Sequence, residues 1–240
     1  QMFGVNAELL IDHAWGYEPC TIAQIRAYKP QSSSLGCGQV LHCPYTADKA
    51  RIVIQEMIDG ISLELVEKRL VTDQLVLTVG YDIENLTRPE IRKVYKGPVT
   101  TDRYGRRVPK HAHGTWNLPR ATSSSSELLE AMAALYDKIV NPALLIRRMS
   151  LSACHVVNEK MAKEREQKET FEQLDLFTDY AKKEAKENEE QKKRERERRM
   201  QEALLTIKKK YGKNAVLRGM NFEEGATAKE RNGQIGGHQA

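Results

Sequence analysis

The chain has 240 residues, of which 30% are charged, and a formal net charge of +5. No apolar run approaches the ~18 residues of a membrane span, and no secretory signal segment is recognisable, so a cytoplasmic protein is expected. The four cysteines are scattered without a CxxC pair, which favours reduced thiols. A mild positive charge is compatible with nucleic-acid binding but does not require it.

The first third of the chain begins with a short amphipathic segment. Residues 5–15 predict a helix, with Asn6 as its N-cap and Gly16 just after its end. The Ser- and Pro-containing stretch 27–36 is typical of a linker. The sequence opens at Gln1 apparently inside a structural element, and we therefore expect a fragment of a longer polypeptide.

The middle of the chain has the clearest hydrophobic periodicity. Apolar residues alternate in the strand-like segments and recur at helical spacing in the two segments between them. The pattern predicts strands at 38–45, 73–82, 114–122 and 145–156, with helices starting at Thr46 and, after a Ser124–Glu127 capping box, at Ser125. The predicted fold is α+β: a split βαβ unit whose four-stranded sheet carries both helices on one face. The opposite face is expected to be polar, with Gln74, Thr78, Ser150 and Ser152.

A long basic connection, residues 83–113, separates the two middle strands. It contains eight Lys and Arg residues against three acids. A connection of this length in a compact domain is functional or disordered more often than not. Phosphate is the natural partner of such a segment, through Arg106, Arg107 and Lys110, and a solvated insertion is the alternative.

The chain from residue 158 on is a charged tail. Residues 182–199 predict an exposed helix or a disordered segment with nascent helix, and no apolar stripe supports a coiled coil. Three acid–base pairs at i,i+4 spacing support the helix: Glu189–Lys193, Glu190–Arg194 and Glu195–Arg199.

A short apolar island interrupts this tail at Gln173, Leu174, Asp175, Leu176 and Phe177. A solvated tail has no core for the three large apolar side chains, so they are interpreted as ligands for a pocket on another molecule. The alternative is one helical turn that packs Leu174 and Phe177 against the preceding domain. The pentapeptide resembles the motif with which bacterial DNA polymerases and repair proteins bind the sliding clamp.

Several further stretches resemble the C-terminal half of a Y-family, DinB/UmuC-like translesion DNA polymerase. The likeness lies in the Phe-Gly-Val-Asn-Ala-Glu start, in Gly-Gln-Val-Leu from Gly38, in Leu-Val-Thr-Asp-Gln-Leu from Leu70, in Leu-Ile-Arg-Arg-Met from Leu145 and in the tail from Tyr211. The resemblance implies three regions: a thumb remnant and linker at 1–31, a DNA-binding little finger domain at 32–157, and a clamp-binding tail at 158–240.

The resemblance also implies a function. The little finger would contact the phosphates of duplex template–primer DNA through Arg147 and Arg148, with backbone amides at Gly38 and Gly114 assisting. The tail would dock on the bacterial sliding clamp, and the protein would act at the nucleoid in error-prone repair of damaged DNA. The Mg²⁺ ions of such polymerases sit on palm carboxylates far upstream, so these 240 residues alone are expected to bind no cofactor and to catalyse no nucleotidyl transfer.

Three alternatives remain. A stand-alone nucleic-acid-binding module of ferredoxin-like topology would stack bases on sheet aromatics, for which only Tyr81 and Trp116 are candidates. The second alternative is a structural or adaptor protein that acts through its charged helix. A zinc site would need Cys37, Cys43, His111 and His113, whose spacing is unlike that of common zinc motifs.

Overall fold

The computed structural model describes residues 7–18, 20–28, 33–102, 104–169, 180–235 and 238–239. The chain divides into two compact units, Gln1–Ser32 and Ser33–Ala240. The predicted clamp-binding segment, 173–177, lies outside the described residues.

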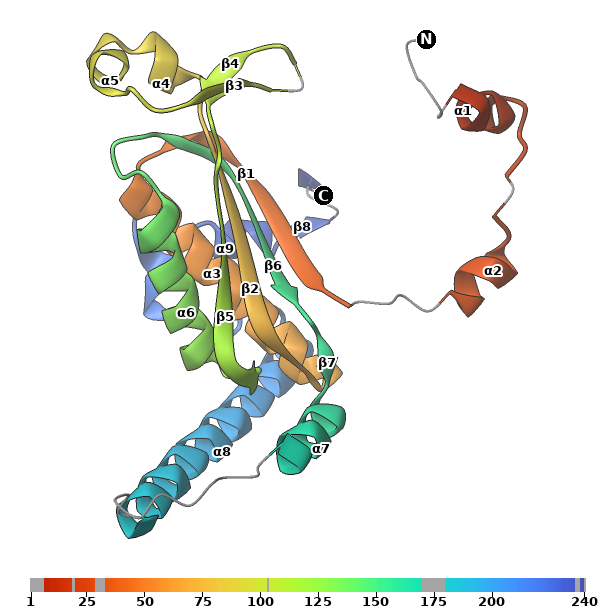
Figure 1. Cartoon of the computed structure of the whole chain (residues 1–240), viewed down its shortest axis with the longest axis vertical. Helices are drawn as coiled ribbons and strands as arrows, with labels where there is room; N and C mark the ends of the chain where they lie inside the picture. Colours follow the sequence, from red (N-terminus) through yellow and green to blue (C-terminus); the bar gives the residue numbers. More distant parts are fainter. Residues whose placement is uncertain are drawn as a thin grey trace. The chain divides into compact units, whose positions relative to one another are not determined.

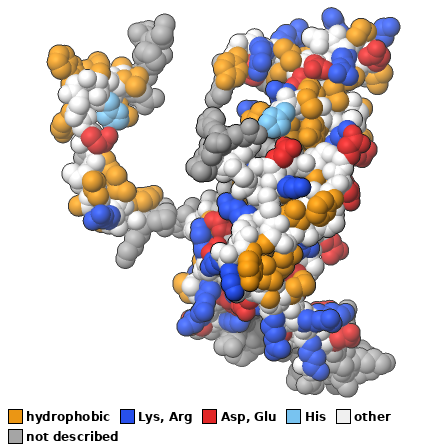
Figure 2. All heavy atoms as spheres, turned by 180° about the vertical axis from the view of Figure 1, so that it is seen from behind, with side chains coloured by type: hydrophobic (Ala, Val, Ile, Leu, Met, Phe, Trp, Pro, Cys, Tyr) orange, Lys and Arg blue, Asp and Glu red, His pale blue; other side chains and the backbone are white. Residues whose placement is uncertain are grey.

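The N-terminal unit contains two short helices. Helix α1 (Ala7–Ala14) confirms the helix predicted at 5–15, whereas α2 (Ile22–Ala27) was not predicted. A capping box starts α2: Gln24 N donates to Thr21 Oγ1 at 3.3 Å and Thr21 N donates to Gln24 Oε1 at 2.8 Å. Neither helix buries a residue, and their apolar side chains are exposed along this unit (Figure 2).

The second unit is built on an antiparallel sheet. Its strands are β1 (Leu35–Tyr45), β2 (Leu70–Tyr81), β5 (Ala112–Thr122) and β6 (Ile146–Cys154), in the spatial order β1-β6-β2-β5 (Figure 1). A short β7 (Val157–Asn158) pairs with the start of β2. The four predicted strands and the α+β class are confirmed. Because the last strand lies between the first two, the two βαβ crossovers interleave, and β1 and β5 form the edges.

Two helices, α3 (Ala47–Lys68) and α6 (Ser125–Ile139), cover one face of this sheet. Helix α3 follows Thr46 and ends at Arg69, which has a left-handed φ of 55°. Helix α6 starts at Ser124, whose Oγ accepts from Glu127 N at 3.3 Å. Alternate residues of β2 enter the core beneath the helices, and Leu75, Leu77 and Val79 are fully buried there.

The basic connection is folded. It forms α4 (Glu84–Thr87), α5 (Pro89–Val94) and a hairpin of β3 (Val99–Thr101) and β4 (Arg107–Pro109). The buried side chain of Asn85 anchors it: Nδ2 donates to the carbonyls of Asp82 and Leu145, both at 2.8 Å, and Oδ1 accepts from Leu145 N at 2.7 Å. This side chain replaces the backbone pairing that a continuous strand would supply, and so fixes where the insertion leaves the sheet.

Much of the described tail is helical, as α7 (Glu159–Glu169), α8 (Tyr180–Tyr211), the 3₁₀ helix η2 (Gly219–Phe222) and α9 (Ala228–Arg231). The short strands β8 (Gln234–Ile235) and β9 (His238–Gln239) follow. Within the range 182–199, predicted as an exposed helix or a disordered segment, every residue whose burial is described is exposed or half-buried, and the first buried residue of α8 lies just beyond it. Gln201 of α8 is 1% exposed and donates to Ser123 O at 3.0 Å and Ser125 Oγ at 2.8 Å.

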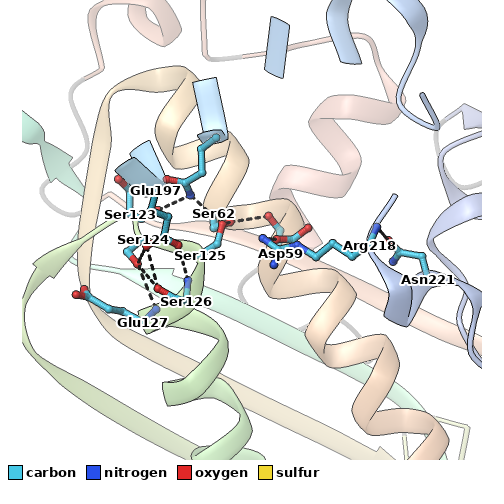
Figure 3. A network of polar contacts seen from close by, with 11 residues as sticks. Asp59, Ser62, Ser123, Ser124, Ser125, Ser126, Glu127, Glu197, Arg218 and Asn221 are labelled. Carbon is cyan, nitrogen blue, oxygen red and sulfur yellow. Dashed lines mark hydrogen bonds and ion pairs between the residues drawn. The ribbon is translucent and has the colours of Figure 1, made fainter. Parts of the chain in front are cut away.

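The serine run at 123–126 is the docking site for α8 (Figure 3). Glu197 accepts from Ser124 Oγ at 2.6 Å, from Ser126 N at 2.8 Å and from Ser126 Oγ at 2.9 Å. The carboxylate thereby satisfies free donors at the start of α6, where the helix dipole favours a negative charge. The sequence pattern predicts that the serine run caps α6 alone, but in the structure it also binds α8.

A buried carboxylate on α3 holds the last part of the tail. Glu56 is 3% exposed; its Oε2 accepts from the backbone N–H groups of Thr227 at 2.8 Å and Ala228 at 3.0 Å, and its Oε1 accepts from Asn221 Nδ2 at 2.8 Å. Gln39 of β1 adds a 3.0 Å hydrogen bond from Nε2 to Thr227 Oγ1. Burying a carboxylate is costly without such donors, so Glu56 and the tail segment depend on each other.

We predict that Glu56→Gln releases this segment. An amide offers one acceptor oxygen in place of two and turns an NH₂ group toward the donors of the tail, so the unfolding free energy should fall by about 2–3 kcal/mol. Hydrogen exchange at the amides of Thr227 and Ala228 reports the release directly. The control is Glu64→Gln on the same helix, which removes an exposed pair with Lys68 (2.6 Å) and should cost less than about 0.5 kcal/mol. Unchanged protection in Glu56→Gln would contradict the prediction.

Candidate nucleic-acid interface

The two crossover helices, α3 and α6, leave the opposite face of the sheet open, and we call it the open face. Its rows combine glycines and small hydroxyl residues with two valines, His113 and Arg148. Strand register places Gly38, Ser150, Thr78 and His113 in one row. The neighbouring rows contain Gly36, Ser152, Val76 and Thr115 on one side, and Val40, Arg148 and Gly80 on the other. No residue in these rows is acidic. The predicted polar positions Gln74, Thr78, Ser150 and Ser152 lie on this face, since they alternate with the buried residues of their strands.

Arg148 is the only cation in these rows. It is exposed, and no ion pair joins it to any residue that the structure describes. Its side chain lies across Gly80: a Cβ added to Gly80 would come within 2.6 Å of Arg148 Cγ and 2.7 Å of Nε. The glycine therefore makes room for the arginine to lie along the sheet, where an anion on this face can reach it.

Arg147, the next residue, has a different environment. Its Nη1 donates to His42 O at 3.0 Å, and its Nε lies 3.8 Å from Asp82 Oδ2. Asp82 is itself buried and accepts from Glu84 N at 2.8 Å. Alternation along β6 thus gives the two predicted arginines different environments: Arg147 helps to hold the base of the insertion, and Arg148 lies on the open face without an ion-pair partner among the described residues.

The two predicted glycines also differ. Gly38 lies on the open face, and a Cβ there would meet only Met149 O at 3.6 Å. Gly114 lies beneath α6, where a Cβ would come within 2.8 Å of Ile139 Cγ2 and 3.0 Å of Leu135 Cδ1. Gly114 therefore lies on the helix side of the sheet, where the lack of a side chain allows α6 to pack closely against β5.

Three cations of the insertion were predicted to meet phosphate. Arg106 is engaged within its own hairpin: it pairs with Asp102 at 2.7 Å, and its guanidinium lies 5.1 Å from the centre of the Tyr104 ring. The hydrogen bond from Arg106 lowers the pKa of Asp102, which keeps the turn charged and closed. Arg107 and Lys110 are exposed and have no carboxylate partner within the described part of the chain.

Some parts of this surface were not expected from the sequence. Val40 is 68% exposed on β1, and Thr78 Oγ1 lies 2.9 Å from His113 Nδ1 across neighbouring strands. The strand alternation could have placed Val40 on the open face, because Leu41 beside it is buried. The contact between Thr78 and His113 depends on the register of β2 and β5, which alternation alone does not give.

Metal ligation finds no support in the described residues, among which no group of three or more His, Cys, Asp or Glu side chains could hold an ion. The structure thus does not assemble the zinc site considered for Cys37, Cys43, His111 and His113. Burial raises the pKa of Cys37 to about 11, which disfavours the thiolate that zinc requires.

No helix in the described part of the chain combines the length and the hydrophobicity of a membrane-spanning segment.

Comparison with known proteins gives limited information. No family model matches the chain, and no curated protein matches it. Among solved structures, a complex of the beta-clamp processivity factor and the little finger domain of PolIV is similar, with a TM-score of 0.34 and 9% sequence identity over 61% of this chain and 100% of the other. Similarity at this level does not assign the chain to a family.

The two glycines provide a test of the sheet's construction. Gly114→Ala should lower the unfolding free energy by about 1–3 kcal/mol, because the added methyl group overpacks the contact with Ile139 and Leu135. Gly38→Ala introduces the same methyl group on the open face and should change stability by less than about 0.5 kcal/mol. Denaturant unfolding of both variants measures the difference, and equal losses would mean that α6 does not press on β5 at this point.

Proposed function

We propose that the second unit binds the phosphate backbone of duplex DNA on its open sheet face, as the DNA-gripping part of a translesion polymerase that is tethered to a sliding clamp. The observation that supports it best is the composition of this face: no acidic residue occurs in its central rows, and the one cation, Arg148, has no partner among the described residues. Such a face attracts phosphate, and apart from Arg148 and His113 its central rows present only short side chains, which do not reach into a groove to read bases.

Small side chains make this face suited to contact with a backbone. Gly36, Gly38 and Gly80 share it with serine and threonine hydroxyls, which donate readily to phosphate oxygens. Phosphate contacts do not depend on the base sequence of the DNA, and a protein that moves along any template requires such contacts. Arg107 and Lys110, on and beside β4, are the further cations that we assign to the same role.

A module that stacks single-stranded RNA on sheet aromatics is less consistent with the structure. Tyr81 is 8% exposed in the core, and its hydroxyl accepts from Asn141 N at 2.9 Å. Trp116 packs against the core on the helix side. The central rows of the open face contain no Phe, Tyr or Trp, so the stacking platform that this alternative needs is missing there.

Clamp docking rests on the pentapeptide alone. In this proposal Leu176 and Phe177 fill a hydrophobic cleft of the clamp, Leu174 assists and Gln173 hydrogen-bonds at the rim. Each buried apolar side chain contributes roughly 1.5–3 kcal/mol before the cost of ordering the segment. A dissociation constant of about 1 μM is expected, which allows exchange between polymerases on one clamp.

We predict that Arg148→Ala weakens binding to primed duplex DNA and lowers the slope of log K against log salt by roughly 0.9, the value for one lost phosphate contact. Arg147→Ala is the matched control and should lower the slope by less, because Arg147 is occupied by Asp82 and His42. Fluorescence anisotropy between about 50 and 200 mM salt measures both. Arg148→Lys should retain the slope. A wild-type slope in Arg148→Ala would contradict DNA binding on this face, and tighter binding to single-stranded RNA would favour the alternative module.

The clamp prediction is separate. Leu176→Ala combined with Phe177→Ala should abolish binding to a bacterial sliding clamp and leave the affinity for duplex DNA unchanged, since the two contacts lie on different parts of the chain. Surface plasmon resonance with immobilised clamp measures the first, and anisotropy the second. The double substitution Glu172→Ala with Thr178→Ala, which flanks the motif, should retain clamp binding. Equal loss of both activities in the first variant would argue against a dedicated clamp motif.

A further inference from the structure

A basic pocket of about 490 Å³ lies where the tail returns to the sheet. Its floor is formed by Val71 of β2 and by Thr122 and Ser123 at the end of β5; α7 and α8 form its walls. Ala162 of α7 is 8% exposed, so this wall is packed against the domain and is not a loose neighbour. Figure 1 shows α7 and α8 at the end of the sheet opposite the α4–α5 insertion.

The charge of the pocket is positive. Five cations and two acids line it: Arg120, Lys163, Arg194, Arg198 and Arg199, with Glu159 and Glu195. Three of the cations have carboxylate partners: Arg120 pairs with Glu127, Lys163 lies 3.2 Å from Glu159 Oε1, and Arg198 Nη2 lies 3.4 Å from Glu159 Oε2. These pairs leave two arginines, Arg194 and Arg199, and one acid, Glu195, as the lining charges without an ion-pair partner among the described residues.

Arg194 and Arg199 have no ion-pair partner within the part of the chain that the structure describes. This differs from the expectation, because Glu190 and Glu195 lie one turn before them at the spacing that favours pairing. Of the three predicted pairs, only Glu189–Lys193 forms, at 3.6 Å. Both arginines instead line the pocket beside Arg198, whose Nη1 donates to Ser123 Oγ at 3.1 Å.

We propose that this pocket binds a phosphate group. The two guanidinium groups outweigh the single unpaired carboxylate of Glu195 in the same pocket, and the planar fork of arginine donates two parallel hydrogen bonds to phosphate oxygens. Pockets of this size accommodate ligands the size of a nucleotide. The phosphate comes from a nucleic-acid strand or from a free nucleotide; the chemistry of recognition is the same for both.

A neighbouring pocket limits where the ligand lies. It has a volume of about 620 Å³ and shares Arg120 and Arg194 with the basic pocket, but its other walls are apolar, with Trp116 and Leu118, and acidic, with Glu130 and Glu190. A second phosphate would be repelled there. The bound group is therefore expected on the side of Ser123 and Arg199. This site does not depend on the open sheet face, and Arg148 is not among its lining residues.

The test uses the full chain carrying Arg148→Ala, so that a failure of DNA binding on the open face does not affect the result. Pyrophosphate is titrated by calorimetry, and a single-stranded oligonucleotide by fluorescence anisotropy. Arg194→Gln with Arg199→Gln should weaken binding by about tenfold and lower the salt slope for the oligonucleotide by roughly 1.4. The matched control, Lys192→Gln with Arg196→Gln, removes two exposed charges of the same helix that do not line the pocket and should change affinity by less than about twofold.

The outcomes separate the sources of the phosphate. A response to pyrophosphate supports a free nucleotide, and a response to the oligonucleotide alone supports a strand. Equal weakening by the two pairs of substitutions would show a diffuse charge effect and overturn the proposal, as would wild-type affinity in the Arg194, Arg199 variant. Binding of a polyglutamate peptide as tight as that of the oligonucleotide would overturn it in favour of a carboxylate ligand. Far-UV circular dichroism confirms that α8 persists in each variant.

Discussion

The fold depends on the alternation of side chains along the central parts of four antiparallel strands with helices on only one face. Leu75, Leu77 and Val79 of β2 lie under α3 and α6, so Gln74, Val76 and Thr78 must lie on the other side. The antiparallel register repeats this division on β6 and β5, and a slip of one residue would bury serine and expose leucine. The apolar half of the alternation stabilises the domain, and the same constraint generates an open face from glycine, hydroxyl and a few other residues that contribute little to the core.

The charged tail is held on the domain in part by polar contacts, whereas the sheet and its two helices are held together mainly by apolar packing. Leu204, Leu205, Val216, Leu217 and Met220 are half-buried, and polar contacts add to them by satisfying donors and acceptors that the domain exposes. Glu197 takes the free donors at the start of α6, and Glu56 receives the backbone N–H groups at the start of α9. Asp59 of α3 lies 2.7 Å from Arg218 beside η2, and burial raises the pKa of this carboxyl against the opposing effect of the arginine. Such contacts are directional, so they help to fix the position of the tail on the domain.

Sequence periodicity was sufficient to predict the strands, the two crossover helices and their arrangement as a sheet covered by helices on one face, because hydrophobic spacing and capping residues act locally. It predicted the four strands, both crossover helices and the polar character of the face with Thr78 and Ser150. It missed α2, whose six residues have too short an apolar pattern, and the docking of the tail. A buried Glu56 and a serine run look like surface residues in a sequence; their roles depend on partners more than 70 positions away in the chain. Strand register and ion pairing are likewise non-local. Alternation alone therefore could not show that Arg147 contacts Asp82 and His42, or that Arg148 has no ion-pair partner among the described residues.

The distinction between paired and unpaired cations bears more on binding than the net charge of +5 does. An arginine such as Arg106, held by Asp102, must lose a carboxylate before it can bind a phosphate, and the exchange of one anion for another releases little free energy. Arg148, Arg107 and Lys110 have no such cost, and they gain from the release of the counterions that condense on DNA. Several paired cations hold elements together: Arg147 and Arg106 at the base and turn of the insertion, Arg51 between α3 and α6, and Arg198 and Arg218 at the contacts of the tail. The chain thus separates the charges that shape it from those that remain for a ligand, and a count of Lys and Arg residues cannot make that separation.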